Sequence, residues 1–417
     1  MEKFDIIVIG GGASGLIAAG RAAELGAKVI LLEKMERVGR KLLITGKGRC
    51  NITNTDTISD FLKKTKPNPK FLKPAFSNFF SKDIISLLEK FGVETKEERG
   101  GRIFPTSDSA AKVVEALIKY VETNGAKIIT NCRVKNLIFE NEELTGVKVS
   151  HNEKTKNIFA KKIIIATGGL SYPATGCTGD GYRFAEKSGH NIIKTQPALV
   201  PIETEGKLAS DLQGLSLKNV KAMVWVNNKK ISEDFGEMLF THYGLSGPII
   251  LTLSRLVVKE LDKKNKVEIS IDLKPALDDQ KLDKRLQRDL NENGKKQIVN
   301  VFKQWLPSKL IPIFLKELNI TANKESHQIT AKERTKIRLL MKNLRFNVSG
   351  YRSYKEAIIT AGGIDTTHIN KKTMASKIVE NLYFAGEVID LDAETGGYNL
   401  QIAFSTAYLS AESAVKK

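Results

Sequence analysis

The sequence is poor in the residues that build disulfide frameworks, zinc sites and membrane spans. Only three cysteines occur in 417 residues, and Cys50, Cys132 and Cys177 form no CxxC pair and no zinc-ligand spacing. The longest apolar runs are much shorter than the roughly 20 residues of a transmembrane helix. The N-terminal segment MEKFDIIVIGGG lacks the pattern of a signal peptide. We therefore expect a reduced cytoplasmic protein with no metal site, dithiol redox centre or membrane partner.

Hydrolase signatures are also missing, because no Ser/His/Asp order and no paired-carboxylate spacing stands out among the five histidines and 47 acidic residues. Acidic residues are fewer than the 66 lysines and arginines, which gives a formal net charge of +19. Such a charge favours anionic partners such as nucleic acid or anionic substrates. The lysines are spread along the chain, however, so the charge alone does not identify nucleic acid as a partner.

The first 35 residues have the pattern of a βαβ unit. FDIIVIG is typical of a buried strand, LIAAGRAAELG of a helix and KVILLE of a second strand. Between the first strand and the helix, GGGASG supplies Gly10, Gly12 and Gly15 in the G-x-G-x-x-G spacing. These glycines serve the tight turn, the backbone approach to a pyrophosphate and close helix–strand packing. This pattern predicts a dinucleotide-binding turn.

The residues around this turn complete the prediction. Ala13 and Ser14 open the helix, whose free N–H groups can meet phosphates. Glu33 ends the second strand 23 residues after Gly10, where a carboxylate binds ribose hydroxyls, and Lys34 follows it.

The far end of the chain favours FAD over NAD. NLYFAGEVIDLDAETGGYNLQIA is an apolar strand ending at Gly386 and Glu387, followed by a glycine pair that opens a long helix. In many flavoproteins such an acid reaches the ribityl chain, and the positive end of the next helix faces the flavin pyrimidine ring. Gly397, Tyr398 and Asn399 form that helix start, and Asn399 is a candidate for the flavin O2 edge. A plain strand–turn–helix return is the alternative.

The composition changes twice along the chain. Residues 195–275 alternate apolar and polar residues in short runs, which suggests a small antiparallel barrel or sandwich. Residues 276–345 look helical, with 16 lysines and arginines against 8 acidic residues. We predict an α/β fold with a discontinuous FAD domain at 1–192 and 355–417. An inserted barrel domain at 193–275 and 346–354 and a helical domain at 276–345 complete it.

Several motifs in matching order carry a resemblance to a known family. GRKLLITGKGRCNITN, GRIFPTSD, ATGGLSYPATGCTGDGY, LFTHYGLSGP and YFAGEVIDLDAETGGYNLQIA together resemble the BaiN-like (YhiN-like) bacterial flavoproteins. These are three-domain FAD-dependent oxidoreductases related to aminoacetone-oxidase-like enzymes. The resemblance implies a Rossmann-type FAD domain built from both ends of the chain, an inserted β-barrel and a helical domain. Lys47 departs from the family pattern, which usually has a glycine run there.

The segment 39–54 is expected to form the second loop around FAD. Its glycines allow backbone amides to approach the cofactor, its polar side chains offer donors to the pyrophosphate or ring edge, and Arg49 is an alternative loop lock. We interpret the cysteine of this loop as packed rather than reactive. The expected residues are Gly39, Arg40, Lys41, Gly46, Gly48, Arg49, Cys50 and Asn51. Elsewhere, the residues expected to contact FAD are Val134, Thr167, Gly168, Gly169 and Asp390.

The catalytic candidates are His242, Tyr398 and Tyr172. His242 lies in FTHYGLSGP of the inserted barrel, and histidine suits proton transfer near neutral pH. A turn histidine that bonds backbone is the alternative. Arg102 is a candidate for binding an anionic substrate group. We expect the active site between the FAD domain and the barrel, because ligand sites favour domain interfaces.

The sequence predicts an FAD-dependent oxidoreductase that transfers a hydride between a small-molecule substrate and the flavin. No second G-x-G-x-x-G marks a nicotinamide domain, so NAD(P)H is expected only as a transiently docked donor, and oxygen is a further candidate partner. Two alternatives stay open. The protein could be a flavoprotein that acts on RNA, with the basic helical insert as docking surface, or a flavin-binding redox sensor or scaffold without turnover.

Overall fold

The computed structural model describes residues 3–416, and the chain divides into two compact units. The first unit comprises the chain up to Pro197 and again from Tyr354 onward, and the second comprises Ala198–Ser353. Both ends of the chain therefore build one unit, and the segment between them builds the other. The α/β fold class is confirmed, with a Rossmann-type sheet in the first unit and a closed barrel in the second.

A seven-stranded sheet forms the centre of the first unit, with the order β7-β2-β1-β10-β9-β8 and with β19 paired to β10. β1, β2, β7, β19 and the second half of β10 run parallel, whereas β8, β9 and the first half of β10 form an antiparallel extension. The strands are β1 (Lys3–Ile9), β2 (Val29–Leu32), β7 (Lys127–Ile129), β8 (Cys132–Glu140), β9 (Glu143–His151), β10 (Lys154–Ile165) and β19 (Leu382–Phe384).

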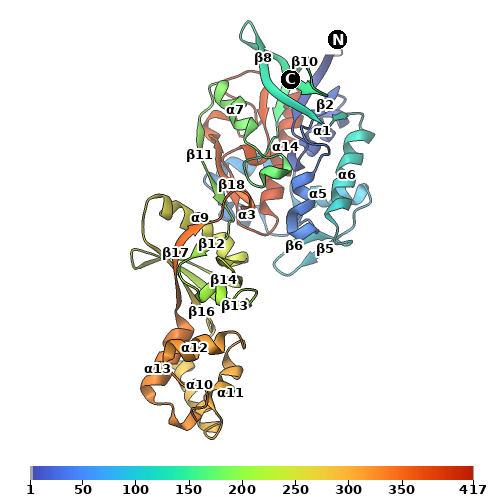
Figure 1. Ribbon diagram of the computed structural model, residues 1–417. Helices are drawn as coiled ribbons and strands as arrows, with labels where there is room; N and C mark the ends of the chain where they lie inside the picture. The colour runs from blue at the N-terminus through green and yellow to red at the C-terminus, as the bar shows by residue number, and fades with distance from the viewer. Residues whose placement is uncertain (1–2, 417) are drawn as a thin grey trace. The chain divides into compact units, whose positions relative to one another are not determined.

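Helices from both ends of the chain pack together in this unit. α1 (Ala13–Glu24) packs against α14 (Tyr398–Val415), so the blue N-terminal helix and the red C-terminal helix share one layer (Figure 1). Leu16, Ile17 and Phe404 belong to one buried cluster, which also includes residues of α6 (Ala110–Thr123). The C-terminal helix therefore packs inside the first unit, and its assignment to an FAD domain stays a prediction.

Helices also cover most of residues 69–90, and this stretch is in pieces. It consists of η2 (Pro69–Leu72), α4 (Lys73–Asn78) and α5 (Ser81–Lys90), because the chain is extended at Phe79 and Phe80. Other short elements of the unit form its loops and small sheets. They are α2 (Arg40–Ile44), η1 (Thr45–Gly48), β3 (Thr53–Asn54), α3 (Ile58–Lys64), β4 (Thr65–Lys66), β5 (Thr95–Glu98), β6 (Arg102–Pro105), η3 (Pro173–Thr175), α7 (Asp180–Lys187), β11 (Ile192–Ala198), β18 (Ile359–Ile364), η5 (Thr366–His368), η6 (Gly386–Val388) and β20 (Asp392–Ala393).

The second unit contains a closed six-stranded barrel in the order β12-β15-β14-β13-β16-β17. The predicted barrel is therefore present, and two helices that the sequence analysis did not predict, the short α8 (Leu208–Asp211) and α9 (Pro248–Asp262), interrupt its strands. α9 begins directly after Gly247 with a proline at its first position, a common helix start, and buries Ile250 and Val257. The strands are β12 (Ile202–Thr204), β13 (Ser216–Val226), β14 (Lys229–Thr241), β15 (Gly244–Ser246), β16 (Val267–Asp272) and β17 (Leu344–Tyr351).

The basic segment is helical, as predicted, with Phe302, Trp305 and Phe314 buried. These aromatic residues and the barrel residues share one hydrophobic cluster, so the helical segment as a separate domain stays a prediction. None of the helices in residues 3–416 has the length and apolar character needed to cross a membrane. The helical elements are α10 (Asp279–Glu292), α11 (Ile298–Trp305), α12 (Leu310–Leu318), η4 (Ser326–Gln328) and α13 (Ala331–Lys342).

Candidate functional site

The three glycines of the first turn have three different environments. Gly10 has φ of 103°, a left-handed conformation that favours glycine, and a Cβ there would lie 2.6 Å from the Ala166 carbonyl oxygen. A Cβ on Gly15 would lie 1.8 Å from the Gly10 carbonyl oxygen, so helix and turn pack too closely for a side chain. Beside Gly12, in contrast, no atom of residues 3–416 other than those of its two chain neighbours lies within 4 Å of a Cβ. The turn is therefore closed on two sides and open at Gly12.

The open position lies at the N terminus of α1, where Ala13 is the first helical residue. The N–H groups of such a helix start have no partner within the helix and bind phosphate well. Ser14 is buried there, and a Cβ on Gly386 would lie 2.6 Å from its Oγ. The Gly386 N–H also donates to Thr406 Oγ1 at 3.0 Å. The two segments predicted to hold the cofactor thus meet in space.

Glu33 supports this turn from the end of β2. Its carboxylate accepts hydrogen bonds from the N–H of Gly11 at 2.7 Å and of Met35 at 2.8 Å. Burial raises the pKa of Glu33, and the bonds from these N–H groups oppose that rise. The next residue, Lys34, donates to Asp180 Oδ2 at 2.8 Å and so ties the turn to α7. These two hydrogen bonds show that Glu33 holds the turn in place. A contact of Glu33 with the ribose of FAD stays a prediction.

The second loop places Lys41 against Glu387. The Lys41 ammonium lies 2.6 Å from Glu387 Oε2 and 2.6 Å from Ser171 Oγ. Glu387 Oε1 accepts from Ser171 Oγ at 2.8 Å and from the Thr360 N–H at 2.9 Å. Burial opposes the charge on Lys41, but the Glu387 carboxylate outweighs it and raises the pKa of Lys41. This network joins four segments that are distant in sequence, and the sequence offered no signal for the pairing.

The rest of the second loop is held by contacts of its own. Arg49 forms ion pairs with Glu98 and Asp108 and lies over the Phe104 ring at 4.2 Å, so its geometry suits the loop-lock alternative. Arg40 pairs with Glu36 at 2.5 Å. Left-handed φ values occur at three loop glycines, which are Gly39 (73°), Gly46 (57°) and Gly48 (85°).

Cys50 and Asn51 face inward from this loop. Cys50 is fully buried, and burial raises the pKa of its thiol to about 12, which fits a packed rather than a reactive cysteine. The Asn51 amide, oriented to satisfy its neighbours, donates to the carbonyls of Ile103 and Thr53 and accepts from the Gly397 N–H. Asn51 therefore links the second loop to the start of α14.

The crossing after β10 contains a polar atom without a partner. Thr167 Oγ1 is buried and, among the described residues, forms no hydrogen bond. Gly168 has φ of 70°, and a Cβ on Gly169 would lie 2.5 Å from Thr360 Oγ1, so the crossing passes close to β18. Val134 is buried in β8. An unpaired buried hydroxyl is costly, and a bound ligand is one way to satisfy it.

The start of α14 is also well defined. Gly397 has φ of 100°, and a Cβ there would lie 2.3 Å from the Thr53 carbonyl oxygen. The Asn399 amide bonds the backbone of Ala393 and Glu394, which is a capping arrangement, so its flavin contact stays a prediction. Asp390 is buried, and its N–H donates to the Ile364 carbonyl at 3.0 Å.

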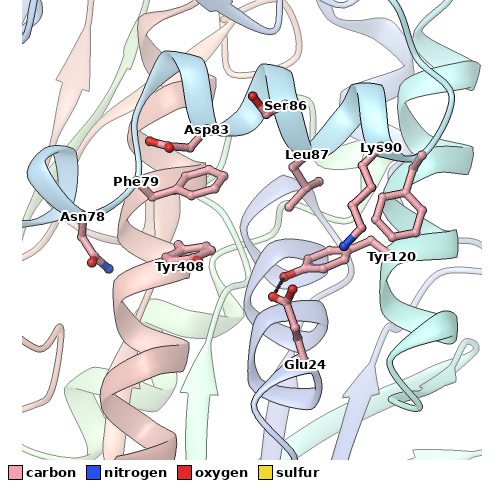
Figure 2. Close-up of a pocket in the computed structure, with 10 residues that line it drawn as sticks. Glu24, Asn78, Phe79, Asp83, Ser86, Leu87, Lys90, Tyr120 and Tyr408 are labelled. Atoms are coloured by element: carbon pink, nitrogen blue, oxygen red, sulfur yellow. Dashed lines mark hydrogen bonds between the residues drawn. The ribbon is translucent and has the colours of Figure 1, made fainter.

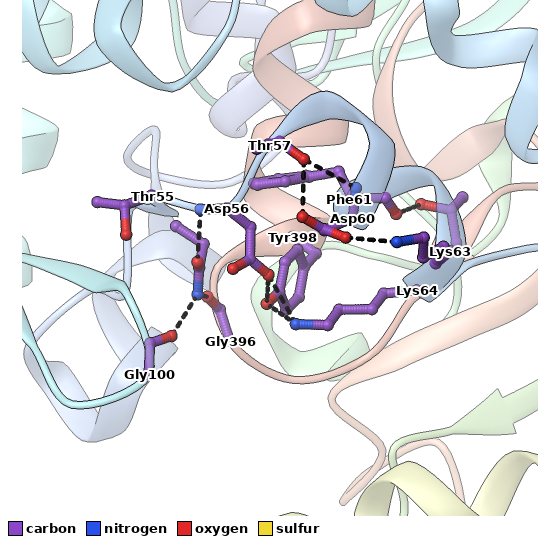
Figure 3. Close-up of polar contacts among 12 residues, drawn as sticks. Thr55, Asp56, Thr57, Asp60, Phe61, Lys63, Lys64, Gly100, Gly396 and Tyr398 are labelled. Atoms are coloured by element: carbon purple, nitrogen blue, oxygen red, sulfur yellow. Dashed lines mark hydrogen bonds and ion pairs between the residues drawn. The ribbon is translucent and has the colours of Figure 1, made fainter.

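Tyr398 carries a contact that the sequence did not reveal. Its phenol donates to Asp56 Oδ2 at 2.7 Å and also meets the Lys64 ammonium (Figure 3). Asp56 and Lys64 were absent from the predicted site. They lie more than 300 positions from Tyr398, and no local pattern indicates such a contact.

The other two catalytic candidates lie apart from this cluster in the chain. Tyr172 precedes η3 with φ of 53°, and its N–H donates to the Tyr354 carbonyl at 2.9 Å. His242 belongs to the second unit, where it is exposed in the two-residue turn between β14 and β15 and contacts the Tyr243 ring. Arg102 donates to the Arg99 carbonyl at 3.0 Å. The catalytic roles of Tyr172 and His242 and the substrate contact of Arg102 stay predictions.

A surface pocket of about 280 Å³ lies elsewhere in the first unit (Figure 2). Glu24, at the end of α1 opposite to the glycine turn, lines it together with Phe79 and Tyr408, whose rings stack at 4.3 Å. The pocket is thus separate from the glycine turn, and we assign it no part in the chemistry.

Three observations show that the described residues are suited to bind FAD. Gly12 is open at a helix N terminus, Thr167 has an unsatisfied hydroxyl, and Gly386 lies against Ser14. Fold and site together define an FAD-dependent oxidoreductase.

The chain belongs to the HI0933-like family, because the HI0933-like protein Rossmann domain matches residues 4–413. The predicted BaiN-like resemblance is confirmed. The chain is 32% identical over 416 residues to the ribosomal RNA dihydrouridine synthase of Escherichia coli, covering 100% of this chain and 99% of that protein. It is 29% identical to the 3-dehydro-bile acid delta(4,6)-reductase of Clostridium scindens, covering 98% of each.

Solved structures of flavoproteins share the fold. The 3-ketosteroid delta1-dehydrogenase from Sterolibacterium denitrificans gives a TM-score of 0.52 at 14% identity, covering 100% of both chains. The Mycobacterium smegmatis Sdh1 complex gives a TM-score of 0.54 at 16% identity, covering 100% of this chain and 68% of that chain. At these identities the likeness concerns the fold alone.

Proposed function

We propose that this protein reduces a carbon–carbon double bond conjugated to a carbonyl, and that its substrate is a uridine of ribosomal RNA. The observation that carries the proposal is the 32% identity over the full length to the Escherichia coli ribosomal RNA dihydrouridine synthase. Dihydrouridine differs from uridine by two hydrogens across C5=C6, a bond conjugated to the C4 carbonyl. The reaction therefore needs one hydride and one proton.

The second full-length relative supports the reaction type and offers a second candidate substrate. Its name, 3-dehydro-bile acid delta(4,6)-reductase, describes the reduction of double bonds conjugated to a C3 ketone. A steroid-like enone is therefore the alternative, in line with the small-molecule substrate that the sequence suggested. The net charge of +19 and the excess of basic residues in 276–345 favour a polyanion over a small molecule.

Bound FAD would supply the hydride in either case. The residues of this chain would do the rest. The N terminus of α1 and Gly12 would bind the pyrophosphate, and Glu33 would accept from the ribose hydroxyls. Tyr398, Tyr172 and His242 are the groups proposed for proton transfer. We propose NAD(P)H, docking transiently, as the electron donor that reduces the flavin. A substrate in ribosomal RNA would also place the protein in the cytoplasm.

Anaerobic reoxidation tests the proposal. The holoprotein is photoreduced and mixed with ribosomal RNA transcribed in vitro, which contains only unmodified uridine, or with a 3-keto-4-ene steroid. We expect the RNA to restore the oxidised flavin spectrum and to contain dihydrouridine, measured by mass spectrometry of digested nucleosides. Transfer RNA transcripts serve as the control. Reoxidation by the steroid alone would favour the second candidate, and reoxidation by neither would favour the sensor or scaffold alternative.

A further inference from the structure

Three polar side chains form a closed triangle at the start of α14 (Figure 3). The Tyr398 phenol donates to Asp56 Oδ2 at 2.7 Å. The Lys64 ammonium donates both to the phenolic oxygen and to the same Asp56 oxygen, the latter at 2.7 Å. Each member of the triangle therefore contacts the other two, which fixes the position of the phenol.

The short helix α3 brings Asp56 and Lys64 to the same place. Asp56 precedes the Thr57 cap of α3, and Lys64 is the last residue of the helix. Two helical turns separate them, so both side chains reach Tyr398 from one side. The Asn54 side chain donates to the Gly396 carbonyl at 3.1 Å and so fastens the glycine pair before α14 to the same segment.

The triangle connects a buried group to solvent. Tyr398 is 3% exposed, and its ring packs edge-on against Phe61 at 4.7 Å. The side chains of Lys64 and Asp56 are 34% and 30% exposed. Tyr398 is also the first residue of α14, the helix whose N terminus is proposed to face the flavin pyrimidine ring. A buried phenol at the proposed cofactor site thus has a polar route to water.

Both the phenol and the ammonium hold their protons at neutral pH. Burial raises the pKa of Tyr398 to about 12, with Lys64 lowering it and Asp56 raising it further. Burial opposes the charge on Lys64, but the hydrogen bond to Asp56 outweighs it and raises the pKa of Lys64 to about 12. The phenol therefore has a proton to give, with a second acid beside it.

We infer that Tyr398, Lys64 and Asp56 form a proton relay for the reduction of the conjugated double bond. Bound reduced FAD would supply a hydride to one alkene carbon, and the Tyr398 phenol would give its proton to the carbon next to the carbonyl. Lys64 returns a proton to the phenolate and recovers one from solvent. The hydride would carry both electrons and one hydrogen, and the phenol would supply the second hydrogen as a proton, so the alkene would be reduced while the flavin is oxidised. Asp56 orients the ammonium. This inference rests on the function proposed above.

Two substitutions with matched controls test the relay. Tyr398→Phe and Lys64→Met remove the acids. Tyr120→Phe removes another phenol that donates to a carboxylate, Glu24 at 2.7 Å, and Lys63→Met removes the neighbouring lysine, which pairs with Asp60 at 2.7 Å. We expect Tyr398→Phe to slow reoxidation of photoreduced protein by roughly 10²–10⁴-fold and Lys64→Met by about tenfold. The two controls should stay within about twofold of wild type.

Reoxidation is measured with ribosomal RNA and, separately, with 2-cyclohexenone, so that a wrong substrate and a wrong relay give different results. If the wild type responds to the enone but not to RNA, the substrate proposal fails and the relay is judged on the enone. Unchanged rates in Tyr398→Phe would overturn the relay. A loss of rate explained by a loss of FAD affinity would also overturn it, because the triangle would then be structural.

A titration that needs no turnover completes the test. Protein labelled with ¹³C at tyrosine Cζ reports the ionisation of each phenol by NMR, and Tyr398→Phe identifies the signal. Removing the negative charge of Asp56 stabilises the Tyr398 phenolate. Asp56→Asn should therefore lower the pKa of Tyr398, read as the midpoint of its titration, below about 12. An unchanged midpoint would show that the carboxylate and the phenol are not coupled and would overturn the relay even where no acceptor reoxidises the protein.

Discussion

Replacing Gly12 with alanine should separate cofactor binding from folding. Gly12 has φ of −83° and ψ of −167°, an extended conformation open to any residue. Since no atom between residues 3 and 416 apart from its two chain neighbours lies within 4 Å of the Cβ position, the added methyl makes no steric clash with the rest of the protein. The free energy of unfolding of the apoprotein should therefore stay within about 0.5 kcal/mol of wild type. The same methyl would stand where the pyrophosphate is proposed to approach.

The expected loss of FAD affinity follows from the bonds that the phosphate could no longer form. A hydrogen bond between a backbone N–H and a charged group contributes about 1.5–3 kcal/mol. Loss of one such bond weakens binding by roughly 10–100-fold, since each 1.4 kcal/mol is tenfold. FAD is titrated into apoprotein by flavin fluorescence, and stability is measured by urea unfolding without cofactor.

Gly15→Ala is the matched comparison, with the same methyl three residues away. Its Cβ would lie 1.8 Å from the Gly10 carbonyl oxygen, a backbone atom that no rotamer change can move. We expect the apoprotein to lose about 1–3 kcal/mol or more of stability. Wild-type FAD affinity in Gly12→Ala, or unfolding of Gly12→Ala as severe as that of Gly15→Ala, would refute the reasoning about the turn.

Three further predictions concern single groups. Glu33→Ala should weaken FAD binding by about 1–3 kcal/mol, because the ribose acceptor and the anchor of the Gly11 N–H are both lost; unchanged affinity in a calorimetric titration would contradict this. In the native protein the thiols should resist a disulfide reagent at pH 8, since all three cysteines are buried and the pKa of Cys50 is about 12. In urea, three thiols should react. His242→Ala should keep the flavin spectrum and lower turnover by roughly 10²–10⁴-fold; normal turnover would return His242 to an ordinary turn residue.

The parts of the site that depend on local geometry could be predicted from the sequence. The GGGASG spacing placed the turn, and the Gly386–Glu387 segment placed the C-terminal return, because turns and strand ends are set by neighbouring residues. The partners of Lys41 and Tyr398 could not be predicted in this way. Lys41 meets Glu387 and Tyr398 meets Asp56 across gaps of more than 300 positions, and such contacts arise only from tertiary packing.

Helix α9 shows a different limit. Its apolar residues follow a helical period after the Gly247-Pro248 start, yet the alternating strands on both sides dominated the interpretation of 195–275. The orphaned hydroxyl of Thr167 is a third case, since hydrogen-bond satisfaction is a property of the packed structure and not of the sequence.

The split first unit also sets an order of assembly during translation. β10 pairs with β19 through Ile163, Ile164 and Ile165, but β19 begins at Leu382, after the whole of 198–353. At roughly 5–20 residues per second, the ribosome needs on the order of ten seconds or more to synthesise that stretch. During this time one edge of β10 carries unpaired isoleucines, the kind of edge that invites wrong strand pairing. The barrel can close before the sheet does, so the nascent cofactor unit is the part most in need of protection from aggregation.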